Sequence, residues 1–473
     1  MIRNTLFMFT STILRFINGV LLFVIMARFW GPEIFGVFMY PYTLAAILVI
    51  LVDYGFNLQL VTDIGKNTHD AHRLTCQALI IKNLLVLIVA AVGLPLLILL
   101  KSLDGYRVLL VMLIFSFVLN SYGMLFNLSF RGMGRFDKEA IAAFWSNITA
   151  FLLIGGLVLF GQGPVTIALG FVFSKAFFGV LSWLIYKQLI GGAKFIYSPM
   201  RIVLKVLRDG FFFAAHVALG TLYFSVDTII IKHFLGAENV GIYQAGLRVM
   251  VGCLILVDVL SNVYLSRMAK DSYDRKALIS LSTRMTRHCL MIGVFIFIFM
   301  IGFSDLIVKF IYGSNGFTKV IPLFPLFGVV LLLRYLGASY GILLTVDNRQ
   351  VVRMVGVGLS VVVSVTLNIL LIPKFNLNGA LIASIITHVF LTGIYIFFAW
   401  RQVQNWLMEK RSWLLISIAS LAGLFQLFII PEYYIVRYTV IIGALLFVGF
   451  VGISSTEYSN LMKRLQRHTS SAT

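Results

Sequence analysis

Four cations lie inside stretches that are otherwise apolar for about 20 residues, the length that crosses a bilayer as a helix. They are Arg15, Lys175, Arg248 and Arg334. A charge at the centre of a bilayer costs about 2.5–3.5 kcal/mol, so such groups normally face a bundle interior or a wet cavity. Both side chains bind phosphate through charge-assisted hydrogen bonds, and arginine does so in bidentate geometry. The four residues predict a cationic cavity for a phosphorylated lipid headgroup, which would be a poor site for a lipophilic cation.

Asp227 is the acidic residue best placed to act with these cations. It lies seven residues before Phe234, and Arg248 lies seven residues after Gly241, so two helices joined by a short loop would place both charges at similar depth. Two interpretations remain open. In one, Asp227 and Arg248 form a structural ion pair. In the other, Asp227 titrates or binds a coupling cation while Arg248 serves an anionic substrate.

Five further ionisable residues are secondary candidates for a role in a cavity. Asp53 and Asp258 lie toward the inner ends of their spans, where pairing with a nearby inner-loop Lys or Arg is the favoured interpretation. Lys82 lies near the inner end of its span, where its side chain can reach the headgroups. His216 and His388 lie within helices and can carry protons, although a hydrogen-bonding role inside the bundle is favoured for both.

The chain contains no arrangement of residues typical of an enzyme. The predicted outer loops are short and hold no cluster of His, Asp and Glu, and the inner loops lack a G-x-x-x-x-G-K phosphate loop. Cys76, Cys253 and Cys289 have no paired spacing, so we expect neither a disulfide nor a metal site, and no cofactor. The amide side chains within spans are interpreted as interhelical hydrogen-bonding groups: Asn18, Gln59, Asn120, Asn127, Asn147 and Gln244.

The elements that must position these residues are membrane helices. Of the 473 residues, 60% are hydrophobic and 12% are charged, whereas soluble domains carry about 25% charged residues. Barrel strands would be about 10 residues long with alternating polarity, which the long apolar runs do not show. We predict an all-α polytopic membrane protein with about fourteen transmembrane helices, at residues 5–28, 36–60, 76–100, 107–130, 139–160, 165–189, 210–234, 241–265, 286–308, 320–345, 353–372, 379–400, 412–430 and 436–455.

An internal repeat organises these spans. The stretch Arg28–Phe38 recurs as His233–Tyr243, 205 residues later, and the same offset relates Asp53 to Asp258. Six spans separate the two copies, so the repeats enter the membrane with the same orientation and are related by a pseudo-twofold axis along its normal. The predicted organisation is a six-helix lobe at residues 1–190, a cytoplasmic linker at 191–209, a second six-helix lobe at 210–401, and helices 13 and 14 with a tail at 402–473. The linker is either an amphipathic helix on the inner surface or a solvated connection.

The basic residues indicate the orientation. If both termini are cytoplasmic, 25 of the 38 Lys and Arg residues lie in inner loops, 8 in outer loops and 5 within spans. The positive-inside rule therefore favours cytoplasmic termini. Membrane topology accounts for most of the net charge of +20, and no nucleic acid is needed to explain it. The outer eight are Arg28, Lys101, Arg107, Lys232, Lys309, Lys319, Lys374 and Arg437.

Three segments resemble polysaccharide transporters of the multidrug/oligosaccharidyl-lipid/polysaccharide (MOP) exporter superfamily. Residues 27–38 resemble the end of helix 1 in these proteins, residues 226–243 their helix 7–8 region, and residues 372–380 the start of their helix 12. The resemblance implies a Wzx-type flippase of the bacterial inner membrane. Such a protein moves undecaprenyl-diphosphate-linked oligosaccharide, such as an O-antigen repeat unit of lipopolysaccharide, by alternating access coupled to sodium or protons. It also implies a coupling role for Asp227, and a glycan polymerase and chain-length regulator as partners.

Two kinds of alternative remain. A flippase for lipid-linked peptidoglycan precursors or a cation-coupled drug exporter would belong to the same superfamily, and the drug exporter predicts an acidic or aromatic cavity. A membrane glycan polymerase or ligase would need a long outer loop with paired Arg or His, and none is visible in the sequence.

Overall fold

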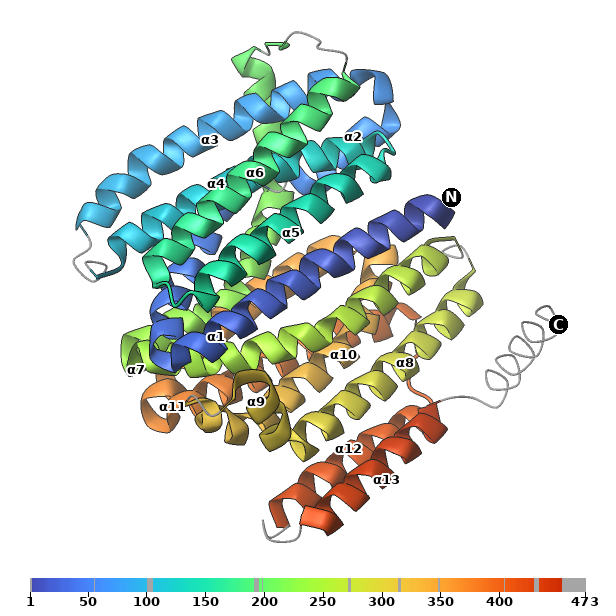
Figure 1. Ribbon diagram of the computed structural model, residues 1–473. Helices are drawn as coiled ribbons and strands as arrows, with labels where there is room; N and C mark the ends of the chain where they lie inside the picture. Colours follow the sequence, from blue (N-terminus) through green and yellow to red (C-terminus); the bar gives the residue numbers. More distant parts are fainter. Residues whose placement is uncertain are drawn as a thin grey trace, which may run out of the picture. The chain divides into compact units, whose positions relative to one another are not determined.

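All the regular elements in the described part of the computed structural model are helices (Figure 1). The structure describes residues 2–54, 56–99, 105–190, 195–197, 199–270, 274–313, 316–347, 349–403, 405–428 and 434–452. The elements are α1 (Ile2–Asp53), α2 (Phe56–Lys66), η1 (Thr68–Asp70), α3 (Ala71–Leu99), α4 (Arg107–Gly132), α5 (Phe136–Leu159), α6 (Pro164–Leu189), α7 (Met200–Lys270), α8 (Arg275–Gly302), α9 (Ser304–Tyr312), η3 (Phe317–Leu323), α10 (Phe324–Val346), α11 (Gln350–Val403), α12 (Lys410–Phe428) and α13 (Tyr434–Gly452).

Three of these helices are too long for one membrane crossing, and each is bent at one residue. The bends lie at Gly31 in α1, Gly236 in α7 and Asn376 in α11, where the backbone leaves the helical region with φ of 73°, 85° and 53°. Among the described residues, 9 helices are long and apolar enough to span a membrane, and these three count among them. Counting the bent helices as two segments each, and adding α12 and α13, gives the fourteen predicted. The predicted all-α polytopic fold is confirmed.

The repeat predicted from the sequence is visible in the two bends. Gly31 and Gly236 are 205 residues apart, and both have a positive φ with an extended ψ, of 175° and −176°. Only glycine adopts this conformation without strain, because a Cβ would meet the backbone. The two hairpins therefore share one backbone geometry at equivalent positions.

The two hairpins also contact each other reciprocally. A Cβ built on Gly36 would overlap the carbonyl oxygen of Ala237, and one built on Gly241 would overlap the carbonyl oxygen of Pro32. Gly36 and Gly241 are equivalent in the repeat, as are Pro32 and Ala237. Such an exchange of equivalent contacts is the signature of a two-fold relation. Because both glycines lack a side chain, the backbones of the two hairpins can touch.

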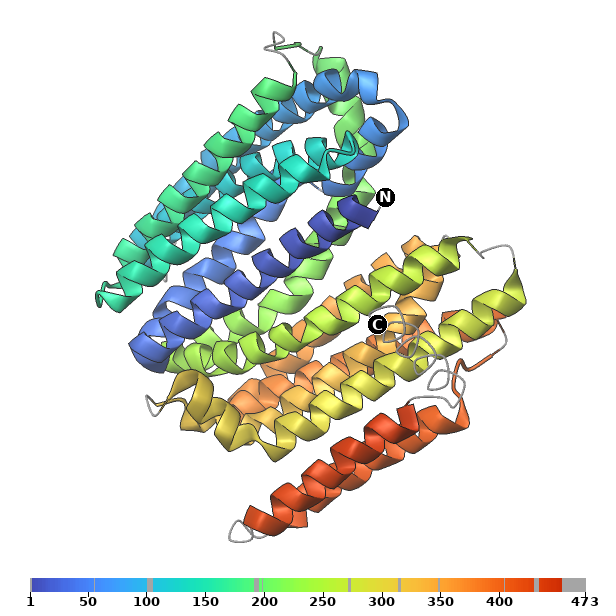
Figure 2. The ribbon, with the colours of Figure 1, turned by 45° about the vertical axis from the view of Figure 1, so that its right-hand side comes forward.

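Internal contacts divide the chain into two compact units. The first comprises residues 1–252, 311–318 and 361–380, and the second residues 253–310, 319–360 and 381–473. In the first unit, α3, α4, α5 and α6 lie side by side (Figure 2), and Phe126, Phe130, Phe178 and Tyr186 form part of a buried core. In the second unit, α8 packs against α10, α12 and α13.

The segment before the seventh predicted span is helical. Residues 200–208 form the first turns of α7, which has no non-helical residue before Gly236. Val203 is buried against Ile81 of α3, and the Tyr54 hydroxyl donates to the carbonyl of Leu207 at 3.0 Å. This part of the predicted linker is therefore helical and is not a solvated connection. It extends α7 and packs on α3.

Substituting alanine for Gly36 should destabilise the protein. The added methyl group would force the two hairpins apart, and overpacking of this kind costs about 1–3 kcal/mol. We expect Gly36→Ala and Gly241→Ala to lower the melting temperature of the purified protein in detergent. Gly156→Ala is the matched control, because nothing lies within 4 Å of a Cβ at that position. Melting temperatures that are equal in all three variants would argue against the contact.

Candidate functional site

A polar cavity of about 260 Å³ lies within the first unit. Helices α1, α4, α5 and α6 contribute its walls. Three phenylalanines, Phe23, Phe117 and Phe171, supply apolar surface. The polar and charged side chains on its lining are Asn18, Tyr42, Ser116, Asn120, Asn147 and Lys175. Aromatic faces beside amide and hydroxyl groups form a lining that suits sugars.

The amide groups of this cavity are held by hydrogen bonds between helices. The Asn18 Nδ2 donates to the main-chain carbonyl of Asn147 at 2.9 Å and to its Oδ1 at 3.1 Å, joining α1 to α5. The Asn147 Nδ2 donates to the carbonyl of Ala143 at 2.8 Å. These contacts agree with the interhelical role predicted for both residues. The Asn18 Oδ1, however, is buried without a hydrogen-bond partner among the described residues.

Two of the four predicted cations belong to this cavity or its wall. Lys175 lines it. The guanidinium of Arg248 lies 4.1 Å from the ring centroid of Phe23, which also lines it, in cation–π geometry. Phe23 packs edge-on against Tyr42, with 5.0 Å between the two ring centroids. Arg248 therefore lies directly behind an aromatic wall of the cavity, and its Nε has no hydrogen-bond partner among the described residues.

The other two predicted cations are placed differently. The backbone of Arg15 is part of α1, but its side chain lies outside the described residues. Arg334 belongs to the second unit, where its charge interacts with Asp258 and His388. A shared role for all four in one headgroup site stays a prediction.

Asp227 is the centre of a buried polar cluster of the first unit. Its carboxylate is 5% exposed and accepts hydrogen bonds from the Tyr243 hydroxyl at 2.7 Å, the Asn368 Nδ2 at 2.8 Å and the Ser364 hydroxyl at 3.4 Å. The guanidinium of Arg248 lies against the ring of Phe23, and the described residues show no ion pair between it and Asp227. The coupling role of Asp227 stays a prediction.

Sequence reasoning missed the partners of Asp227 on α11. Ser364 and Asn368 are one helical turn apart, and the Asn368 Nδ2 also donates to the Ser364 carbonyl at 2.9 Å. A serine and an asparagine at i and i+4 lie on one helix face, which was a detectable signal in an apolar span. The Asn368 Oδ1 is buried without a hydrogen-bond partner among the described residues. The cluster therefore still has an unused oxygen acceptor.

Lys82 and Asp53 form a buried ion pair. The Lys82 Nζ lies 2.9 Å from Asp53 Oδ1, and the two side chains are 3% and 30% exposed. Ser121 hydrogen-bonds to both, through its hydroxyl, and its carbonyl accepts from Lys82 at 3.0 Å. The prediction that Lys82 reaches toward the headgroups is wrong. Its ammonium group is bound within the bundle by the carboxylate of Asp53 on α1 and the hydroxyl of Ser121 on α4. Asp53 is paired as expected, but with a lysine of α3 rather than of an inner loop.

The remaining candidates have structural surroundings. The His388 Nδ1 lies 2.8 Å from the Ser384 carbonyl in α11, the hydrogen-bonding role predicted for it. The side chain of His216 lies outside the described residues. α8 begins at Arg275, earlier than the predicted start at residue 286, and the buried guanidinium of Arg287 on this helix pairs with Glu409 at 3.0 Å. The N-cap Asp274 explains the earlier start, because its carboxylate accepts from the backbone of Lys276 and Ala277.

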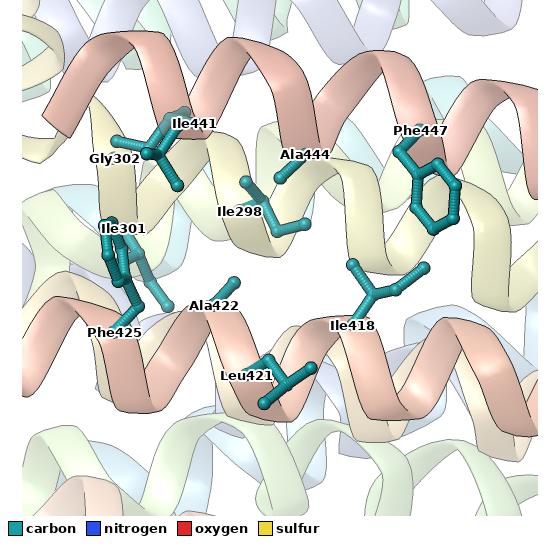
Figure 3. Close-up of a pocket in the computed structure, with 11 residues that line it drawn as sticks. Ile298, Ile301, Gly302, Ile418, Leu421, Ala422, Phe425, Ile441, Ala444 and Phe447 are labelled. Carbon is teal, nitrogen blue, oxygen red and sulfur yellow. The ribbon is translucent and has the colours of Figure 1, made fainter. Parts of the chain in front are cut away.

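A second recess lies within the second unit and is wholly apolar. It has a volume of about 400 Å³ and is enclosed by α8, α12 and α13 (Figure 3). Ile298 of α8, Ile418 of α12 and Phe447 of α13 are typical of its lining, which includes no polar side chain. A charged headgroup buried there would lose its hydration and gain no hydrogen bond or ion pair in return. The recess therefore suits only a hydrocarbon chain.

Residues 1–270 match the sequence profile of a family described as polysaccharide biosynthesis protein, which is more than half of the chain. The chain belongs to this family. It is 22% identical over 210 residues to the teichuronic acid biosynthesis protein TuaB of Bacillus subtilis (strain 168), covering 43% of this chain and 42% of that protein. The match thus spans less than half of that relative's length.

Solved structures share the fold over most of the chain. The lipid II flippase MurJ in an inward closed conformation aligns with a TM-score of 0.68 and 14% identity, over 98% of this chain and 100% of MurJ. An inward-facing multidrug resistance MATE family transporter of the MOP superfamily aligns with a TM-score of 0.67 and 15% identity, over 83% and 95% of the two chains. At such identities the likeness establishes the fold, which is that of multi-pass MOP superfamily transporters.

Breaking the ion pair of Lys82 should be costly. Lys82→Met leaves a carboxylate partly buried without its partner, which we expect to destabilise the protein by about 3 kcal/mol. The double variant Lys82→Met/Asp53→Asn removes both charges and should recover part of this loss. Unfolding of the purified protein in mixed micelles measures the effect. Lys66→Met is the control, because its pair with Asp63 is exposed and worth at most about 1 kcal/mol. Equal losses in the two single variants would contradict the assignment.

Proposed function

We propose that this protein is a flippase for undecaprenyl-diphosphate-linked oligosaccharide, the repeat unit of an O-antigen or related surface polysaccharide. The observation that carries the proposal is the cavity of the first unit, where amide and hydroxyl groups occur together with Lys175 and, behind Phe23, Arg248. Membership of a polysaccharide biosynthesis family and the fold shared with a lipid II flippase support it. A drug exporter fits less well, because a lysine in the lining would repel a lipophilic cation.

The proposed roles follow from the chemistry of each group. Lys175 and Arg248 bind the diphosphate, and Arg15 and Arg334 contribute if transport brings them to it. The amides of the cavity bind sugar hydroxyls. The lipid tail stays in hydrocarbon. Two six-helix lobes, residues 1–190 and 210–401, would expose the site alternately to each side.

The proposed location is the inner membrane of a bacterium, with both termini cytoplasmic and transport from the cytoplasmic to the outer leaflet. The charge distribution of the loops supports this orientation. A polymerase and a chain-length regulator would receive the product. A flippase for lipid-linked peptidoglycan precursors is the second candidate, because MurJ aligns over nearly the whole chain and its substrate would require the same diphosphate chemistry. Accumulation of lipid-linked repeat units, rather than of peptidoglycan precursors, on deletion of the gene distinguishes the two.

We further propose that Asp227 couples transport to an ion gradient. A sodium ion takes oxygen ligands, and the cluster offers the Asp227 carboxylate, the hydroxyls of Tyr243 and Ser364 and the Asn368 Oδ1. A proton on the same carboxylate would serve equally as the coupled ion. Either ion would neutralise a charge that is costly within the membrane, and so alter how α7 and α11 pack.

Removing a cation of the cavity should abolish export while the protein remains inserted. We expect Lys175→Ala and Arg248→Ala to lower surface-polysaccharide production at least about tenfold, because each loses a charge-assisted contact with the diphosphate. Lys187→Ala on α6 and Arg267→Ala on α7 are matched controls, since both side chains are exposed. Protein levels are compared by immunoblot. Full export in both cavity variants at normal levels would disprove the headgroup site.

Neutralising Asp227 should uncouple transport from its ion. Asp227→Asn removes the charge that binds the ion, so uptake of lipid-linked substrate into inverted vesicles should no longer respond to a sodium or pH gradient. Asn368→Ala should weaken the response by removing one oxygen ligand. Asp63→Asn, a surface aspartate paired with Lys66, serves as the control. An unchanged ion dependence in Asp227→Asn would remove this residue from coupling.

A further inference from the structure

A third recess lies in the first unit, near the bends of α1, α7 and α11. It has a volume of about 530 Å³ and is lined by Tyr40 of α1, Lys232, His233 and Phe234 of α7, and Ile369 of α11, together with two isoleucines of α7. None of these residues lines the polar cavity described above. The recess is therefore a separate site, and it places a cation and a tyrosine among apolar side chains.

Its depth matches the headgroup region of a membrane. At 1.5 Å per residue, Lys232 lies about 6 Å from the bend at Gly236, and Ile369 lies about 10 Å from the bend at Asn376. The headgroup regions together add about 10–15 Å to the hydrocarbon core. The headgroup region of one leaflet is therefore about 5–7 Å thick, which places Lys232 at the level of the headgroups and Ile369 just inside the hydrocarbon. In the proposed orientation, these bends face the outer side.

The cation of the recess is held in place by aromatic rings. The Lys232 Nζ lies 5.2 Å from the ring centroid of Tyr106, and Tyr106 packs edge-on against Tyr40 at 5.4 Å. Among the described residues, no carboxylate forms an ion pair with Lys232. A cation–π contact is worth about 0.5–2 kcal/mol and leaves the N–H groups able to donate. The ammonium group of Lys232 is therefore held in position by the ring of Tyr106 while its positive charge stays available to an anion.

The rim of the recess is apolar and exposed. Phe234 is 42% exposed and Ile369 is 48% exposed, and they belong to different helices, α7 and α11. Acyl chains can cover such side chains, while a phosphate reaches the ammonium between them. One lysine, with an imidazole as a further hydrogen-bond donor, matches the single negative charge of a phosphodiester. A diphosphate carries at least two charges and would leave one without a partner.

We propose that this recess binds the phosphodiester of an anionic phospholipid of the outer leaflet, with Lys232 as its charge partner. Only the choice of leaflet depends on the proposed orientation. Binding of such a lipid joins α1, α7 and α11 near their bends. It is independent of the substrate proposed above.

Lipid retention by the full-length protein tests this assignment. The protein is purified in detergent and titrated with phosphatidylglycerol or with phosphatidylcholine of the same acyl chains, and bound lipid is counted by native mass spectrometry. We expect one phosphatidylglycerol to bind about tenfold more tightly than phosphatidylcholine. Lys232→Gln should abolish this preference, while Lys232→Arg should keep it. Lys309→Gln, an exposed lysine of α9, is the control and should also keep it.

Three outcomes would overturn the proposal. The wild type could bind the two lipids equally, or Lys232→Gln could retain the preference. Undecaprenyl diphosphate could also compete with bound phosphatidylglycerol more strongly than added phosphatidylglycerol does. That result would assign the recess to a diphosphate lipid instead. Because retention is measured without transport, a failure here is distinguishable from a failure of the cavity variants Lys175→Ala and Arg248→Ala.

Discussion

Hydrocarbon offers no hydrogen bonds, so every polar group within the membrane must find its partner in the protein. This constraint explains the arrangement of the first unit. Lys82 lies between Asp53 and Ser121, and Asp227 is surrounded by hydroxyl and amide donors. Arg248 differs, because its guanidinium rests on the face of Phe23. A charge held by an aromatic ring keeps its capacity to bind an anion, whereas one held by a carboxylate has lost most of it.

The two halves of the duplication contact each other through their hairpins. Gly36 and Gly241 allow the two backbones to touch, and each hairpin contributes an equivalent glycine and an equivalent carbonyl group to the contact. Asp227 and Arg248 lie on the two arms of the second hairpin, on either side of Gly236. Movement at this contact would therefore be transmitted to the ion cluster and to the wall of the cavity together. The proposed alternating access would use such a connection between ion and substrate.

The three recesses differ in the chemistry that each can hold. The cavity with Lys175 combines amides, hydroxyls and aromatic rings, which together suit a phosphorylated sugar. The recess at Ile298 and Ile418 has no polar side chain and accepts only hydrocarbon. The recess at Lys232 has one cation and an apolar rim. The proposed transport of a lipid with a large polar headgroup would use separate surfaces for headgroup, hydrocarbon and surrounding lipid.

The sequence alone determined the helical class, the number of spans and the repeat, because these depend on local apolar length and on a fixed offset between similar segments. It also gave Asp227 and the cations Arg15, Lys175, Arg248 and Arg334 as candidates, since any charge in a long apolar run is conspicuous. The sequence could not show which side chains from other helices bind these charged groups. Ser364 and Asn368 are far from Asp227 in the chain, and only the packing of α11 against α7 brings them to it. Whether an intramembrane charge is neutralised or left available is therefore decided by tertiary structure, because the partner that neutralises it comes from another helix.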